Sequence, residues 1–168
     1  MRCSLFSFLV AISIFSIASA SQAGKEFVDP DGKYKLSLVG DWKAITYNDA
    51  VGRQKTEFVY RDRSEGLLKI STEKLSGDSV EILVRQEEDN LKTYRAGFQR
   101  ITLEQFGGAL KGMMLAFHTT EGGRNTSNAF YYLQDGNTIW VLKFTGKRGL
   151  LDVNRNLTDQ IARSFKTN

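Results

Sequence analysis

A basic corner between two glycines is the first place in this sequence that could bind a ligand or a partner. Gly146 and Gly149 enclose Lys147 and Arg148, after an apolar run and before a segment with helical periodicity. Glycines allow a sharp turn, and the first N–H groups of a helix lack partners within the helix, so the corner could hold an anion or a protein. The alternative is that Lys147 or Arg148 pairs with an acidic side chain and the glycines only shape the turn. That structural role is favoured, because a phosphate loop needs more N–H groups aimed at one point.

Two further basic residues complete the set of candidate contacts for a partner or an anion. The set is Lys147, Arg148, Arg124 and Lys143.

The remaining residues offer little for catalysis. The only cysteine, Cys3, lies in the first segment, so the rest of the chain has no thiol nucleophile and no thiolate metal ligand. The only histidine, His118, could act as a general base, but the end of a strand is more typical of a hydrogen-bonded or exposed histidine. The acidic run 87–89 could suggest paired carboxylates, yet consecutive helical residues point in different directions, which favours a solvated face. We predict no catalytic residue, no metal site and no cofactor.

Residues 29–32 read Asp-Pro-Asp-Gly, which resembles the start of a calcium loop. The later ligands of such a loop do not follow, so a turn is the better interpretation.

The first 23 residues are typical of an export signal. Arg2 gives a positive start, residues 5–17 are apolar, and small residues before positions 21 and 24 permit cleavage. We expect a signal peptide over residues 1–23 and one domain over residues 24–168, located in the periplasm or outside the cell.

Without Arg2 the chain keeps 22 basic and 19 acidic residues, a net charge of +3. These charges alternate along the chain, which argues against nucleic-acid binding.

Short runs of aromatic and β-branched residues predict an antiparallel meander near the start of the domain, over residues 34–38, 42–47, 56–60 and 67–72. A helix follows, with Val80, Leu83, Val84, Leu91 and Tyr94 on one side and Glu81, Arg85, Glu88, Asp89 and Lys92 on the other. Asp78 and Glu81 resemble a capping box at its start. Strands return over residues 98–106, 112–120, 128–134 and 138–145.

The last two strands should pair antiparallel, because Asp135-Gly136 can supply a two-residue hairpin turn. Residues 113–117 and 139–142 are apolar without alternation, so both faces of those strands must be covered. A final helix provides the second cover, with Leu150, Val153, Leu157, Ile161 and Phe165 at helical spacing. The predicted fold class is α+β, a single antiparallel sheet flanked by helices on both faces.

These features together resemble the PsbP family. The resemblance is carried by residues 32–38, by Asp41-Trp42, by Asp135-Gly136 with the apolar strand after it, by residues 146–148 and by Ser164-Phe165. It covers nearly the whole predicted domain and implies the PsbP/Mog1-like fold. PsbP proteins are extrinsic subunits of photosystem II, so the resemblance implies a protein partner on a membrane complex and, in a photosynthetic source, the thylakoid lumen.

Two features of the plant family do not carry over. A histidine reported there as a metal ligand, after a glycine pair and a basic residue, is replaced here, where residues 122–125 read Gly-Gly-Arg-Asn. The plant subunit also docks with the help of a long N-terminal arm, whereas only a few residues separate the expected cleavage sites from the first strand here, so docking through such an arm is not expected.

The expected function is that of a monomeric, non-catalytic accessory protein that binds a partner in the cell envelope. The alternative is a small-ligand-binding protein or an enzyme, with a pocket between the sheet and a helix. Neither expectation involves nucleic acid or a transmembrane segment in the mature protein.

Overall fold

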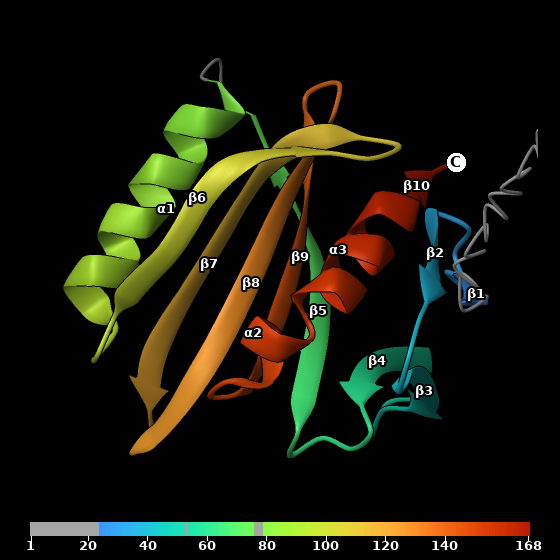
Figure 1. The fold of residues 1–168 in the computed structure, drawn as a ribbon. Helices are drawn as coiled ribbons and strands as arrows, with labels where there is room; N and C mark the ends of the chain where they lie inside the picture. The colour runs from blue at the N-terminus through green and yellow to red at the C-terminus, as the bar shows by residue number, and fades with distance from the viewer. Residues whose placement is uncertain (1–23, 53, 76–78) are drawn as a thin grey trace, which may run out of the picture.

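The computed structural model describes residues 24–52, 54–75 and 79–168. The signal peptide predicted over residues 1–23 lies outside the described residues. Within them, seven antiparallel strands form the main sheet in the order β3-β4-β5-β9-β8-β7-β6 (Figure 1). Their bounds are β3 (Trp42–Asn48), β4 (Gln54–Tyr60), β5 (Gly66–Lys74), β6 (Gln99–Gly107), β7 (Lys111–Glu121), β8 (Arg124–Asp135) and β9 (Thr138–Lys147).

The hairpin predicted at the end of the sheet is confirmed, with a turn shifted by one residue. β8 and β9 pair antiparallel, and Asp135 is itself paired with Thr138. The turn therefore consists of Gly136 and Asn137, and Gly136 takes a positive φ of 57°. This hairpin puts β9 in the middle of the main sheet.

The expectation of one sheet is wrong in one respect. β2 (Tyr34–Leu38) belongs to a second sheet, between β1 (Lys25–Val28) and β10 (Lys166–Thr167). Since β1 and β10 occupy both edges of β2, it cannot pair with β3. The alternating pattern of β2 predicts a strand but not its partner. Leu36 and Leu38 are buried in the core beneath this small sheet.

Both faces of the main sheet are covered, which confirms the predicted sandwich. On one face, α1 (Val80–Tyr94) buries Val80, Val84 and Leu91 against the sheet. On the other face, α2 (Leu150–Val153), α3 (Arg155–Ser164) and β2 form the cover (Figure 1). Neighbouring residues of β8 therefore face different cores, Tyr131 beneath α3 and Tyr132 beneath α1.

The structure differs from the prediction at the start and in the middle of α1. The proposed capping residue Asp78 lies outside the described residues, and Ser79 caps the helix by accepting a hydrogen bond from the Ile82 N–H at 3.3 Å. Glu88, predicted on the solvated side, is instead buried. Its carboxylate contacts Arg100 on β6 and Lys92 one turn later, so ion pairing permits a charge at this position.

The predicted C-terminal helix is divided in two at Asn154. The Asn154 side chain donates a hydrogen bond to the Leu150 carbonyl at 2.9 Å, the kind of local bond by which asparagine ends a helix. As a result Val153, expected on the apolar side, is 82% exposed.

In the described part of the chain, every helix is too short or too polar to cross a bilayer.

Candidate functional site

Three of the four predicted contact residues lie together at one end of the main sheet. Arg124 begins β8 directly after the turn from β7, and Lys147 ends β9 opposite Thr126. The backbone N–H of Arg148 then donates to the Asn125 carbonyl at 3.1 Å, which holds the chain after β9 beside the start of β8. We call Arg124, Lys147 and Arg148 the basic end. It lies at the lower end of the sheet in Figure 1, where α2 begins.

Within the basic end, Lys147 has a structural partner. Its ammonium group pairs with the carboxylate of Glu65, and its backbone N–H donates to the Glu65 carbonyl at 3.1 Å. The loop before β5 is thereby joined to β9. Arg124 and Arg148 are both exposed, and within the described residues neither guanidinium has an acidic partner. The two arginines are therefore the charges of this end that are free to contact another molecule.

The anion alternative receives little support from the backbone of the corner. Gly149 adopts a left-handed φ of 83° and precedes α2, which comprises Leu150–Val153. A helix of one turn has a small dipole and few free N–H groups, so it offers a weak anion site.

Two exposed apolar side chains lie on the helices next to the basic end, one on each face of the sheet. Tyr94, the last residue of α1, is 80% exposed, and Val153 on α2 is 82% exposed. The end of α1 is held beside the β7–β8 turn by an Arg95–Glu121 ion pair of 3.0 Å. The sequence pattern predicts that Tyr94 and Val153 lie on buried faces, and this prediction is wrong. Their position at a helix end is the only signal that could have suggested exposure.

Lys143 lies apart from the basic end, in a groove between α1 and the sheet. Its ammonium group is 3.6 Å from the Glu87 carboxylate and stands 5.1 Å from the centre of the Phe130 ring. The groove has a volume of about 270 Å³ and is also lined by Asn128. The Asn128 amide is buried and donates to the Phe117 carbonyl and to threonine hydroxyls. This groove is the pocket that the alternative function requires.

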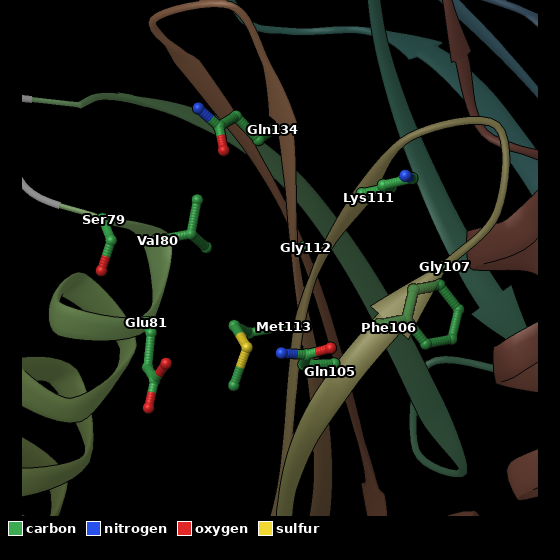
Figure 2. Close-up of a pocket in the computed structure, with 10 residues that line it drawn as sticks. All are labelled: Ser79, Val80, Glu81, Gln105, Phe106, Gly107, Lys111, Gly112, Met113 and Gln134. Carbon is green, nitrogen blue, oxygen red and sulfur yellow. The ribbon is translucent and has the colours of Figure 1, made fainter.

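A hollow at the opposite end of α1 is larger, with a volume of about 500 Å³ (Figure 2). The Ser79 hydroxyl at its rim caps α1, and Glu81 pairs with Arg85 one turn further on. In Figure 2 the Lys111 side chain extends away from the helix. The polar groups therefore do not converge on a single point, as a ligand site requires.

His118 takes part in a contact that resembles part of a catalytic triad. Its Nε2 lies 2.9 Å from Oδ2 of Asp152 on α2, and Ser127 is its partner on the neighbouring strand. The Ser127 side chain is fully buried, and its hydroxyl donates to the Lys147 carbonyl at 2.9 Å. A nucleophile needs a free hydroxyl that substrate can reach. The His118–Asp152 contact instead joins α2 to β7.

The described residues bring no group of three histidine, cysteine or acidic side chains together as a metal site. The acidic turn at residues 29–32 is a turn in the structure as well: the Gly32 N–H donates to the Asp29 carbonyl at 2.7 Å. Asp31 forms an ion pair of 2.8 Å with Lys33.

The sequence matches no protein-family model and no curated protein. Solved structures nevertheless share the architecture. The cyanobacterial PsbP protein CyanoP of Synechocystis sp. PCC 6803 is 12% identical with a TM-score of 0.60, over 95% of this chain and 99% of that one. The Ran-binding protein Mog1p of Saccharomyces cerevisiae is 10% identical with a TM-score of 0.59, over 88% of this chain and 96% of that one.

A third structure comes from a mycobacterial protein. LpqN of Mycobacterium tuberculosis, which is involved in cell envelope biogenesis, is 13% identical with a TM-score of 0.53, over 89% of this chain and 88% of that one. The chain therefore has the PsbP/Mog1-like α+β fold, as the resemblance in its sequence implied. Identities this low establish the fold and leave the function to be argued from the site.

Proposed function

We propose that this chain is an exported, non-catalytic binding protein that docks onto a membrane complex or another envelope partner through its basic end. In a phototroph the membrane complex would be photosystem II. The single observation that carries the proposal is the pair of exposed arginines, Arg124 and Arg148, without acidic partners in the described part of the chain and flanked by exposed Tyr94 and Val153.

The chemistry of these side chains suits a protein partner. Arginine and tyrosine are enriched among the residues that dominate interface energies, because they combine a large contact area with hydrogen bonding. A carboxylate on the partner can accept two parallel hydrogen bonds from one guanidinium. The partner surface should therefore be acidic, with an apolar contact for Tyr94.

Export is part of the proposal and rests on the segment 1–23. Two of the similar structures support it by analogy: CyanoP is a PsbP protein, the family whose resemblance implies a partner on a membrane complex, and LpqN is involved in cell envelope biogenesis. Mog1p binds Ran, so the fold also serves partners elsewhere. Mass spectrometry of secreted or periplasmic material tests this part directly. A mature protein starting at Ser21 or Gly24 is expected, and a retained segment 1–20 in mature material would contradict it.

Docking is tested by capture from native membranes with the tagged protein. The variant Arg124→Glu/Arg148→Glu should lose the partner, because both free cations become repulsive to an acidic surface. The matched control is Lys35→Glu/Lys166→Glu, which changes the net charge equally at two neighbouring residues of the small sheet. The control variant should still capture the partner. Capture by the original protein and by the control should both weaken as the salt concentration is raised. Equal capture by both variants would remove the basic end from the proposal.

The groove beneath α1 supports a second candidate, a small-ligand carrier. Asn128 and Lys143 give it polar groups over an apolar wall that includes Leu91 and Phe130. A melting screen with small metabolites tests this function, and Asn128→Leu separates it from the first. A ligand that raises the melting temperature of the original protein but not of Asn128→Leu would favour the carrier.

A further inference from the structure

The main sheet is split between β4 and β5. The two strands pair only at Phe58↔Leu68 and Val59↔Leu67. β3 stays paired with β4 as far as Gln54, and β9 stays paired with β5 as far as Lys74. The β3–β4 hairpin therefore bends away from the sheet (Figure 1), and residues 54–57 lie opposite residues 69–72 without a ladder between them. Each of these two segments presents a strand edge with free backbone groups.

A groove of about 680 Å³ lies along this split. Residues 54–56 form one lip, residues 70–72 form the other, and the turn at 29–33 closes one side. Trp140 and Tyr34 line it, with ring centres 5.6 Å apart. Both rings also pack on Phe165 in the core, which fixes their positions. The groove thus combines hydrogen-bonding lips with a rigid aromatic floor.

We propose that this split binds an extended segment of a partner protein as an additional strand on β5. The free amides and carbonyls along the β5 edge are complementary to another extended backbone, so a segment added there hydrogen-bonds to β5 through every second residue. The inference is independent of the basic end, which lies at the other end of β5, where Gly66 pairs with Gly146.

The surroundings define the side chains of the bound segment. In a strand added to β5, alternate side chains point to the same face as Ile70, Thr72 and Trp140, so they should be apolar or aromatic. The intervening side chains share the face of Lys69, Ser71 and Glu73, which are exposed, so they should be polar. Asp29 and Asp31 oppose Lys33 and Lys55 among the lining charges, so the groove favours a segment with little net charge.

The outer strands β3 and β6 also have free edges, but in each case a bound segment would meet a single strand and no second lip. β6 is in addition irregular, with a register shift between Arg100 and Thr102 that interrupts a continuous ladder. The split is the place where two edges and an aromatic floor meet.

The probe for this inference is a library of random ten-residue peptides displayed on phage and selected on the full chain. Selected peptides should alternate apolar and polar residues and should lack proline at their centre. In a synthetic version of the best peptide, N-methylation of every second amide should weaken binding by about tenfold each, the effect of losing one backbone hydrogen bond. Methylation of the intervening amides should change the affinity little. Hydrogen exchange of residues 70–74 should slow when peptide is bound.

Thr72→Trp tests the location, because its side chain would fill the groove above Trp140. It should abolish peptide binding, whereas Thr93→Trp on the exposed side of α1 should bind like the original protein. The Arg124→Glu/Arg148→Glu variant should also bind the peptide normally, which separates this result from docking at the basic end. The inference is overturned if no alternating peptide is selected, if methylation shows no alternation, or if exchange slows at β3 or β6 instead of residues 70–74. The methylation and exchange measurements use the original protein, so they decide the matter even if Thr72→Trp does not fold.

Discussion

The carboxylate of Glu88 on α1 lies 3.1 Å from Nη1 of Arg100 on β6 and joins the helix to the edge of the sheet. The Glu88 side chain is only 3% exposed, whereas half of the Arg100 side chain is exposed. A buried carboxylate needs its partners, because its hydration has been lost.

We therefore expect Arg100→Met to lower the free energy of unfolding by about 1–3 kcal/mol, since Lys92 alone would remain for Glu88. Urea unfolding measures this. Arg85→Met is the control, because the Arg85–Glu81 pair is exposed on both sides and should contribute little. Equal effects of the two substitutions would mean that Glu88 does not depend on Arg100.

The neighbouring tyrosines 131 and 132 should respond in opposite ways to the loss of their hydroxyl groups. The Tyr131 hydroxyl lies 2.6 Å from Oδ1 of Asp159 and 2.8 Å from the Thr158 hydroxyl. The Tyr132 hydroxyl is buried beneath α1, and none of the described residues forms a hydrogen bond with it. Tyr131→Phe should cost about 1–2 kcal/mol, whereas Tyr132→Phe should be neutral or stabilising by up to about 1 kcal/mol. Thermal unfolding of both variants tests this, and a clear loss of stability in Tyr132→Phe would contradict it.

Gly112 cannot accept a side chain without movement of the backbone of β8. A Cβ atom added there would lie 1.7 Å from the Tyr132 carbonyl oxygen. Gly112→Ala should therefore destabilise the protein by at least about 1–3 kcal/mol, the usual cost of forcing extra atoms into a packed region. Gly107→Ala is the matched control, because a Cβ at Gly107 meets open space and Gly107 does not need a positive φ. Denaturant midpoints of the two variants that differ by less than the error would refute the close approach.

Alkaline pH should destabilise the protein through its buried tyrosines. Burial raises the pKa of Tyr34 to about 12, and the charge of Asp29 adds to the effect. Burial also raises the pKa of Tyr131 and of Tyr132 above the usual range. In the unfolded chain these groups lose their protons near pH 10, so the folded state binds more protons above that pH. Stability is therefore fully present below about pH 10 and falls as the pH rises toward 12. Tyr34→Phe should show a smaller fall in the denaturant midpoint over this range.

The architecture could largely be predicted from the sequence, because the apolar runs of β7 and β9 required cover on both faces and the helical periods of α1 and α3 supplied it. The small sheet could not be predicted, because the alternation of β2 indicates which side of the strand is buried but not which strand lies beside it. The predicted exposure of Glu88 was wrong for a related reason. A charged residue is assigned to solvent unless its ion-pair partner is known, and Arg100 lies on another element.

The candidate site was predictable in part. Lys147, Arg148 and Arg124 stand out as basic residues near glycines, and the hairpin and its register bring them to one end of the sheet. The pairing of Lys147 with Glu65 joins residues far apart in the chain, and local pattern carries no information about it. The split between β4 and β5 is equally hidden, because each strand has an ordinary strand sequence and only the register reveals where pairing stops.

The position of β9 has a consequence for the order in which the molecule is built. β9 pairs with β5 on one side and with β8 on the other, so the part of the sheet made by β3, β4 and β5 joins the part made by β6, β7 and β8 only through residues 138–147. A chain that emerges from its amino end therefore completes the sheet late, through contacts between distant residues such as Gly66 and Gly146, and such contacts slow folding. This order of assembly suits the export proposed above, because a chain that folds slowly remains extended long enough to be threaded through a translocation pore.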